Sequence, residues 1–246
     1  MNGFPQFTAI LFDLDGTLRD NQPTGHEAFW QHAESLGVIS DIESRRNSQR
    51  WAFKYWAESD LLLGDIEMFG ETRGNPAFWE NYALRYLEAM GCKPETAQEL
   101  GPKISAYMHD HYQPEDVILP GVIPALESLK VAGTKLGVVT NRTDPVGGYL
   151  EEIGLCAYFA FSLAGGEVEA RKPYPQIFEA ALERIGSAPE ETIYVGDNYY
   201  ADVVGARNAG LHPILVDPLE VFPDADCPVV RHLGELQPLL FSEILE

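Results

Sequence analysis

The sequence predicts an α/β fold, a Rossmann-like three-layer α/β/α core built on a parallel sheet, with an all-helical module inserted into it. Two observations predict the core: short apolar runs recur along the chain, and helical segments separate the later runs. A third observation predicts the insertion, because residues 21–113 contain no good strand pattern and hold all four tryptophans.

Four apolar runs have the composition of strands that are buried on both faces of a sheet. They are TAILFD, KLGVVT, TIYVGD and HPILVD, at residues 8–13, 135–140, 192–197 and 212–217. Each is rich in valine, isoleucine, leucine or aromatic residues, which favour strands. The first three end in a polar residue that is followed by loop-forming sequence.

Three segments between or beside these runs have helical patterns, at residues 120–133, 173–186 and 200–210. Each ends in glycine, a common residue at helix C-termini. Alternating strands and helices predict parallel pairing, and in such sheets ligands bind at the carboxyl ends of the strands.

The region between the first two strands is interpreted as about four amphipathic helices, at residues 26–37, 45–64, 75–91 and 97–112. Its tryptophans are spaced close to a helical repeat, which favours a bundle packed by aromatic side chains and disfavours a cofactor-binding box. They are Trp30, Trp51, Trp56 and Trp79. We therefore expect two domains: a core of residues 1–20 and 114–246, and a helical module of residues 21–113.

The chain has 246 residues and a formal net charge of -21 at pH 7. Such a field repels phosphates, so the composition argues against non-specific binding to nucleic acid or to an anionic membrane surface. Any anionic substrate must be held by a local group of cations. The acidity by itself indicates solubility and carries no information about the fold.

The three cysteines, Cys92, Cys156 and Cys227, form no Cys-x-x-Cys pair. This spacing argues against a disulfide framework and against a zinc site, and it fits a reducing compartment. The sequence before Asp13 has no basic segment followed by a long apolar one, and no apolar run approaches the roughly 20 residues of a membrane span. We expect a cytoplasmic protein.

Polar residues follow the predicted strands where each strand ends, and parallel strands bring such residues to one edge of the sheet. They are Asp13, Asp15, Thr140, Asn141 and Asp197, joined by Asp202 and by Lys172 before the helix at 175. Asp13 and Asp15 would share a face of an extended segment, so either a cation lies between them or they belong to a solvated Asp-Gly turn.

This inventory suits phosphoryl chemistry. Asp13, Asp197 and Asp202 offer the hard oxygen ligands that Mg²⁺ prefers. Thr140 offers a hydroxyl donor and Lys172 a positive charge for phosphoryl oxygens. One carboxylate can act as a nucleophile while a second, two residues away, serves as acid and then as base.

The segments DLDGT, VVTN, RKPYPQIF and VGDNYYADVVGARNAG resemble, in this order, the four motifs of the haloacid dehalogenase-like (HAD) hydrolase superfamily. The inserted helices resemble the C1-type cap of that superfamily, and the likeness to its phosphatase branch, of the phosphoglycolate phosphatase kind, spans residues 8–217. The fourfold match in the correct order makes the resemblance specific.

The resemblance implies a role for each matched residue. Asp13 would attack phosphorus and form an aspartyl-phosphate, and Asp15 would protonate the leaving oxygen and then activate water. Thr140, with the backbone at Asn141, would bind phosphoryl oxygens, and Lys172 would steady Asp13 and the transferring group. Asp13, the backbone carbonyl of Asp15 and Asp197 would ligate Mg²⁺, with Asp202 supporting the metal directly or through water.

Some of these residues also have structural explanations. Asp202 could favour only a helix dipole, and the Asn141 side chain could cap a turn. His109 and His111 suggest a metal site, but residues two apart on a helix do not share a face, so solvated positions are favoured.

Asp15 favours a phosphatase, because the dehalogenases of this superfamily lack an acid at that position. The predicted reaction is therefore Mg²⁺-dependent hydrolysis of a small phosphorylated metabolite, a phosphate monoester. A phosphomutase, a 2-haloacid dehalogenase and a non-catalytic binding protein of the same fold remain alternatives. The oligomeric state stays open between monomer and homodimer.

Substrate choice is expected to depend on the inserted helices. Their basic cluster could receive an anionic or aromatic leaving group, or could form a solvated face paired with nearby glutamates. It comprises Arg45, Arg46, Arg50 and Lys54. Arg19 replaces the small aliphatic residue common in the family, which suggests contact with the substrate or the cap and puts specificity for phosphoglycolate in doubt.

Overall fold

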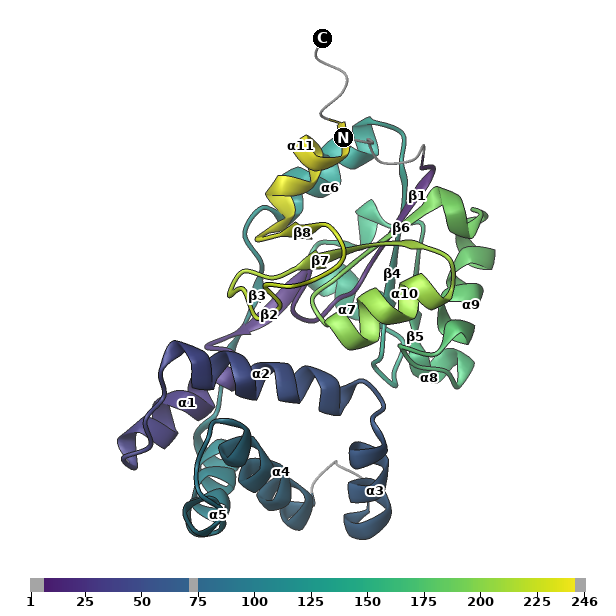
Figure 1. Ribbon diagram of the computed structural model, residues 1–246. Coiled ribbons are helices and arrows are strands. Elements are labelled where there is room, and N and C mark those ends of the chain that lie inside the picture. The colour runs from purple at the N-terminus through teal and green to yellow at the C-terminus, as the bar shows by residue number, and fades with distance from the viewer. Residues whose placement is uncertain (1–6, 71–74, 242–246) are drawn as a thin grey trace. The chain divides into compact units, whose positions relative to one another are not determined.

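The structure is a computed structural model that describes residues 7–70 and 75–241. It divides into two compact units, seen in Figure 1. The first holds the chain up to Asp20 and again from Ile118 onward, and the second runs from Asn21 to Val117. The expected return to the core at residue 114 thus lies four residues before the observed one.

The first unit contains a sheet of six parallel strands in the order β5-β4-β1-β6-β7-β8. The strands are β1 (Ala9–Phe12), β4 (Lys135–Thr140), β5 (Phe161–Ala164), β6 (Thr192–Gly196), β7 (His212–Val216) and β8 (Val229–Val230). The four predicted strands are β1, β4, β6 and β7, and the parallel α/β prediction is confirmed. The two edge strands are too short, at four and two residues, to form a recognisable apolar run.

Alternate residues of the central strand β1 enter different cores. Ile10 and Phe12 belong to one hydrophobic cluster, whereas Ala9 and Leu11 belong to the other, and all four are fully buried. This follows from the two-residue period of a strand, which sends neighbouring side chains to opposite faces. The sheet is therefore covered on both sides.

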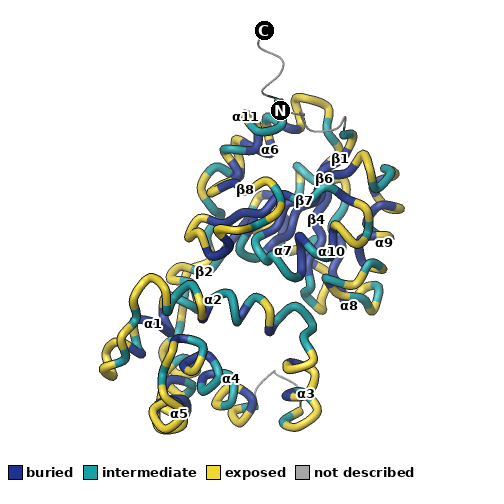
Figure 2. The backbone as a smooth tube through the Cα atoms, in the orientation of Figure 1, coloured by how far each residue is buried: buried dark blue, intermediate teal, exposed yellow. Residues whose placement is uncertain are grey.

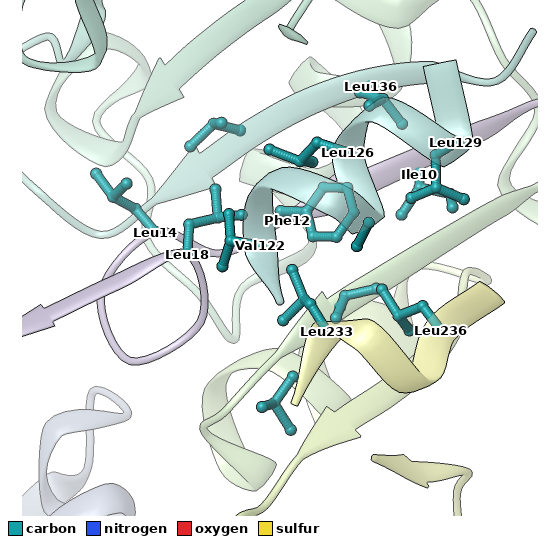
Figure 3. Close-up of a cluster of buried hydrophobic side chains, with 14 of the residues drawn as sticks. Ile10, Phe12, Leu14, Leu18, Val122, Leu126, Leu129, Leu136, Leu233 and Leu236 are labelled. Atoms are coloured by element: carbon teal, nitrogen blue, oxygen red, sulfur yellow. The ribbon is translucent and has the colours of Figure 1, made fainter. Parts of the chain in front are cut away.

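Helices α6 (Val122–Val131), α7 (Gly147–Glu152) and α11 (Leu236–Phe241) contribute to the first cluster. Figure 3 shows Ile10 and Phe12 beside Leu126 and Leu129 of α6. Helices α9 (Pro175–Ile185) and α10 (Val204–Asn208) contribute to the second. The short α8 (Gly165–Val168) follows β5, and single turns of 3₁₀-helix occur at Cys156–Tyr158, Pro189–Glu191 and Leu233–Glu235.

The segment after β6 differs from the single helix predicted for residues 200–210. It begins as a π-helix, Tyr199–Val203, and only then continues as α10. The side-chain oxygen of Asn198 accepts hydrogen bonds from the backbone N–H groups of Tyr200 and Ala201 and so caps this turn. A π-turn is wider than an α-turn and is often found at functional sites.

The second unit is helical, as predicted, and consists of α1 (Gly25–Ser35), α2 (Ile42–Trp56), α3 (Asp60–Phe69), α4 (Pro76–Ala89) and α5 (Pro94–His111). The prediction of one helix over residues 45–64 is wrong. The chain leaves α2 at Ala57, Glu58 has a left-handed φ of 52°, and Ser59 caps α3 by accepting from Leu62 N.

Aromatic side chains fill the interior of this helical unit. Tyr55, Phe78 and Tyr86 are almost completely buried, and the ring of Trp51 lies 4.9 Å from that of Tyr55, centroid to centroid. Figure 2 shows the buried stretches of these helices as dark segments between exposed ones. The tryptophan spacing therefore reflects packing of the bundle.

Two short strands that the sequence analysis did not predict, β2 (Arg19–Gln22) and β3 (Glu115–Ile118), pair where the chain passes between the units. None of the helices in the described ranges is long and apolar enough to cross a bilayer.

Candidate active site

Three neighbouring strands deliver acidic and hydroxyl side chains to one edge of the sheet. Asp13 follows β1, Thr140 ends β4 and Asp197 follows β6. Because β1 lies between β4 and β6, these residues are adjacent in space, as the sequence predicts. The backbone N–H of Asp13 donates to Val195 O at 2.9 Å and so extends the ladder of β1 and β6 to Asp13.

Three carboxylates gather at this edge. Asp13, Asp197 and Asp202 each offer an oxygen atom, and these atoms all lie within 4.8 Å of one another. Hard oxygen donors at this spacing match the ligand preference of Mg²⁺, which completes its octahedron with waters or substrate oxygens. The donor set therefore fits the predicted metal.

Lys172 lies among these carboxylates and is 2% exposed. Its Nζ donates to Asp13 Oδ1 and to Asp202 Oδ1, both at 2.7 Å. The same atom lies 5.5 Å from the centre of the Tyr194 ring, in cation–π range. Two charge-assisted hydrogen bonds and an aromatic neighbour hold this ammonium group in one place.

Asp202 belongs to this group of charges and does more than occupy the first turn of a helix. It is 1% exposed, and its Oδ2 accepts from the backbone N–H of Asn198 at 2.9 Å while Oδ1 accepts from Lys172. The π-turn supplies both Asp202 and its backbone donor.

Two glycines permit the carboxylates to come this close. Gly16 has φ of +81°, and a Cβ atom built on it would lie 2.2 Å from Asp197 Oδ2. A Cβ atom on Gly196 would lie 2.3 Å from Asp202 Oδ2. Any side chain at either position would push a carboxylate out of the cluster.

Burial and repulsion from neighbouring carboxylates oppose ionisation of Asp13 and Asp197 in the metal-free protein. Burial raises the pKa of Asp13 to about 7, against the lowering effect of Lys172. Burial also raises the pKa of Asp197 well above its usual range, and Asp13 and Asp202 raise it further. Burial disfavours charge on Lys172, but the carboxylates of Asp13 and Asp202 outweigh it and raise the Lys172 pKa well above its usual value. One ammonium does not balance three carboxylates, so a divalent cation would be stabilising here.

The side chain of Asn141 is bonded to the backbone of Lys172. Its Oδ1 accepts from Lys172 N at 2.7 Å and its Nδ2 donates to Lys172 O at 3.0 Å. The sequence predicts phosphate binding by this residue, with a turn cap as the alternative for its side chain. The side chain joins two loops, and Thr140 at the end of β4 is 2% exposed.

The Asp15 side chain lies in a different environment from the three clustered carboxylates. Arg142 donates to it through Nε at 2.9 Å and Nη2 at 2.6 Å, and Arg19 donates through Nη1 at 3.1 Å. Arg19 stands out in the sequence, whereas Arg142 was not predicted to take part in the site. A signal was present, because Arg142 is a cation that directly follows Thr140 and Asn141 in a strongly acidic chain.

Two other groups expected from the sequence lie in the helical unit. Arg45 of the basic cluster pairs with Glu34 at 2.6 Å, and its guanidinium lies 5.3 Å from the Trp30 ring centre. For Arg45 this agrees with the alternative of a solvated helix face paired with nearby glutamates. His109 and His111 are exposed, as expected of solvated positions.

Known proteins resemble this chain over most of its length. A family model described as a haloacid dehalogenase-like hydrolase matches residues 7–210. Ribulose-1,5-bisphosphate 5-phosphatase of Halopiger xanaduensis is 33% identical over 223 residues, 87% of this chain and 86% of that protein. Phosphoserine phosphatase of Thermus thermophilus is 27% identical, covering 96% and 99% of the two chains, and a phosphoglycolate phosphatase of Shigella flexneri is 30% identical, covering 85% and 81%.

Solved structures give the same picture. A 2-haloacid dehalogenase from Pseudomonas syringae is similar with a TM-score of 0.54 and 28% identity, over 96% of this chain and 98% of that one. A HAD phosphatase from Thermococcus onnurineus has a TM-score of 0.54 and 26% identity, over 96% and 98% of the two chains.

Proposed function

The chain belongs to the haloacid dehalogenase-like hydrolase family, and we propose that it is a Mg²⁺-dependent phosphatase that works through an aspartyl-phosphate on Asp13. Its phosphatase relatives make it a phosphoric monoester hydrolase acting on small phosphorylated substrates. The metal, the covalent intermediate and the residue roles are the proposal. The observation that carries it is the group of three carboxylates within 4.8 Å of one another, with Lys172 bonded to two of them.

In the first step, an Asp13 oxygen attacks the phosphorus atom and the ester P–O bond breaks, while Asp15, in its protonated form, gives a proton to the leaving oxygen. In the second step, Asp15 takes a proton from water and the water oxygen attacks the phosphorus atom of the aspartyl-phosphate. The bond between phosphorus and the Asp13 oxygen breaks, which frees Asp13 and releases inorganic phosphate. Lys172 holds Asp13 in position, and Thr140 with the backbone at Asn141 binds the phosphoryl oxygens.

A Mg²⁺ ion would be held by Asp13, Asp197 and the backbone carbonyl of Asp15, with Asp202 acting directly or through water. When bound, it neutralises charge on the phosphoryl oxygens. Without it, three carboxylates would repel an incoming phosphate.

The substrate class is inferred from the relatives. Their names specify a ribulose bisphosphate, a phosphoserine and a phosphoglycolate, all of them small phosphorylated metabolites. We propose a substrate of that size, with the helical unit acting as a C1-type cap. A cytoplasmic location and a monomeric or homodimeric state stay predictions.

A second candidate reaction follows from one comparison, because the similar Pseudomonas syringae structure is a 2-haloacid dehalogenase. Asp15 argues for the phosphatase, because it can protonate the oxygen of a leaving alcohol. A halide leaves as a stable anion, so hydrolysis of a carbon–halogen bond needs no such proton donor. A phosphomutase or a non-catalytic protein would share the same cluster.

Release of inorganic phosphate from phosphate esters, with Mg²⁺ and with EDTA, tests the proposal. We expect turnover only with the metal, and loss of turnover in Asp13→Asn but not in the exposed control Asp110→Asn. Mass spectrometry of the acid-quenched wild type should show a phosphorylated peptide containing Asp13. If Asp13→Asn still hydrolyses the phosphate esters that the wild type hydrolyses, the mechanism is refuted. Halide release from 2-haloacids would favour the dehalogenase. Phosphate moved between two positions of one sugar without release would favour the mutase.

A further inference from the structure

Two arginines converge on Asp15 within the first unit. Arg142 contacts both carboxylate oxygens and Arg19 contacts one of them. Two guanidinium groups thus meet at one carboxylate, beside the carboxylate cluster. In a chain with a net charge of -21, such a local gathering of arginines is where an anion would be held.

Tyr149 of α7 holds the two guanidinium groups side by side. The Arg142 guanidinium carbon lies 4.5 Å from the Tyr149 ring centre and that of Arg19 lies 6.0 Å away. An aromatic face under a guanidinium restricts its motion without consuming all of its hydrogen-bond donors. The pair is therefore preorganised, which reduces the entropy lost when an anion binds.

The two arginines differ in accessibility. The Arg19 side chain is 7% exposed and the Arg142 side chain is 33% exposed. A guanidinium has five N–H donors in a planar fork, and the pairing with Asp15 takes one from Nε and one from Nη2 of Arg142. Arg142 can therefore contact a bound anion while it stays bonded to Asp15. The buried Arg19 adds a fixed positive charge beside Asp15.

The position of this pair defines where the anion would lie. Arg142 is two residues from Thr140, and its backbone N–H contacts Thr140 Oγ1 at 3.3 Å. Asp15, which the arginines hold, is the group proposed to protonate the leaving oxygen. An anion at Arg142 would thus belong to the leaving group, a few bonds from the ester oxygen.

We propose that Arg142 and Arg19, whose guanidinium groups lie over the ring of Tyr149, form a second anion site. This site selects phosphate monoesters whose leaving group carries a carboxylate or a second phosphate. This inference rests on the proposed phosphatase function and specifies its substrate class. A purely positioning role for Arg142, acting only through Asp15, is the competing explanation. The two explanations differ in what loss of Arg142 does to binding.

Matched substrates separate the two explanations. Phosphoglycolate and 2-hydroxyethyl phosphate differ in one terminal carboxylate, and ribulose 1,5-bisphosphate and ribulose 5-phosphate differ in one phosphate. In Arg142→Gln we expect KM to rise about tenfold to a hundredfold for the member of the preferred pair that carries the second anionic group, and less than about threefold for the member that lacks it. The larger rise is the loss expected for a hydrogen bond to a charged group. Arg142→Lys should recover part of the loss, and the exposed Arg231→Gln should leave both KM values unchanged.

An equal fall in kcat for both members of each pair, with KM unchanged, would overturn the proposal and leave Arg142 as a positioning residue for Asp15. The pair that responds identifies the anion as carboxylate or phosphate.

Binding without turnover keeps the proposal independent of the phosphatase assignment. By calorimetry on the Mg²⁺-loaded wild type, phosphonoacetate should bind at least about tenfold more tightly than methylphosphonate, and Arg142→Gln should abolish that difference. Equal affinities in the wild type would overturn the second anion site. If no ester is hydrolysed but the difference in affinity holds, the proposed function fails and the anion site stands.

Discussion

Asn141 and Lys172 are joined by two hydrogen bonds, from Lys172 N to Asn141 Oδ1 at 2.7 Å and from Asn141 Nδ2 to Lys172 O at 3.0 Å. The same lysine reaches Asp13 and Asp202 through its ammonium group. Asn141, in the loop after β4, therefore holds the backbone of Lys172, and Lys172 in turn holds the proposed nucleophile Asp13.

Asn141→Ala should lower kcat because it removes both bonds and releases the Lys172 backbone. The expected loss is about 1–3 kcal/mol, or roughly tenfold to a hundredfold in kcat, from the two unpaired backbone groups. Steady-state kinetics measure it, with the exposed Asn47→Ala as the control. An unchanged kcat with a raised KM would instead indicate that the Asn141 side chain binds substrate directly.

Lys172→Met should destabilise the metal-free protein. The side chain is 3% exposed and is paired with two buried carboxylates, so its removal leaves charge uncompensated at a cost of about 3–5 kcal/mol. Urea unfolding in EDTA measures the change in the free energy of unfolding. The exposed Lys103→Met, which breaks a surface pair with Glu99, should cost less than about 1 kcal/mol. Equal losses in the two variants would contradict the expectation.

Gly16→Ala should weaken metal binding more than it weakens the fold. Its methyl group would lie 2.2 Å from Asp197 Oδ2 and would displace that carboxylate. Gly133→Ala is a matched control, because Gly133 has φ of +82° against +81° for Gly16 and no atom lies within 4 Å of its added Cβ. Both variants share the backbone strain of about 1 kcal/mol, so calorimetry with Mg²⁺ should show reduced affinity in Gly16→Ala alone. Equal affinities in the two variants would show that Asp197 is not a ligand.

Acid should destabilise the helical unit through His26. Burial lowers the His26 pKa from 6.5 to about 4, and its Nδ1 lies 2.8 Å from Tyr86 Oη. Because the folded pKa lies below the unfolded value, the contribution to stability is complete above pH 6.5 and is lost as the pH falls toward 4. Since the side chain is partly exposed, we expect a loss of at most about 2 kcal/mol between pH 7.5 and pH 5.

Urea unfolding at the two pH values measures this loss. His26→Gln should be less stable at pH 7.5 and should show a smaller fall at pH 5 than the wild type, whereas the exposed His109→Gln should behave as the wild type does. The same fall in all three proteins would assign the acid sensitivity to other groups.

The local sequence pattern was sufficient to predict the central strands of the sheet and the acidic residues at its carboxyl edge. Apolar runs of six residues identify β1, β4, β6 and β7. The residues that end them, such as Asp13 and Asp197, must meet because parallel strands share one carboxyl edge. Edge strands β5 and β8 were not predicted, because runs of four and two residues have no measurable period. The break between α2 and α3 was not predicted for another reason. The sequence keeps a helical composition through the break, which is made by one residue in the left-handed conformation, Glu58.

The sequence by itself determined the α/β core, the helical insertion, the family resemblance and the identity of the acidic residues, because each depends on neighbours in the chain. Only the tertiary structure decided how those residues are paired. Asp15 meets Arg142 across 127 positions, and Asn141 meets Lys172 across 31, so no local spacing could reveal either pair. The fold brings the strand ends together, and the polar and charged groups there then form the hydrogen bonds and ion pairs that compensate their burial.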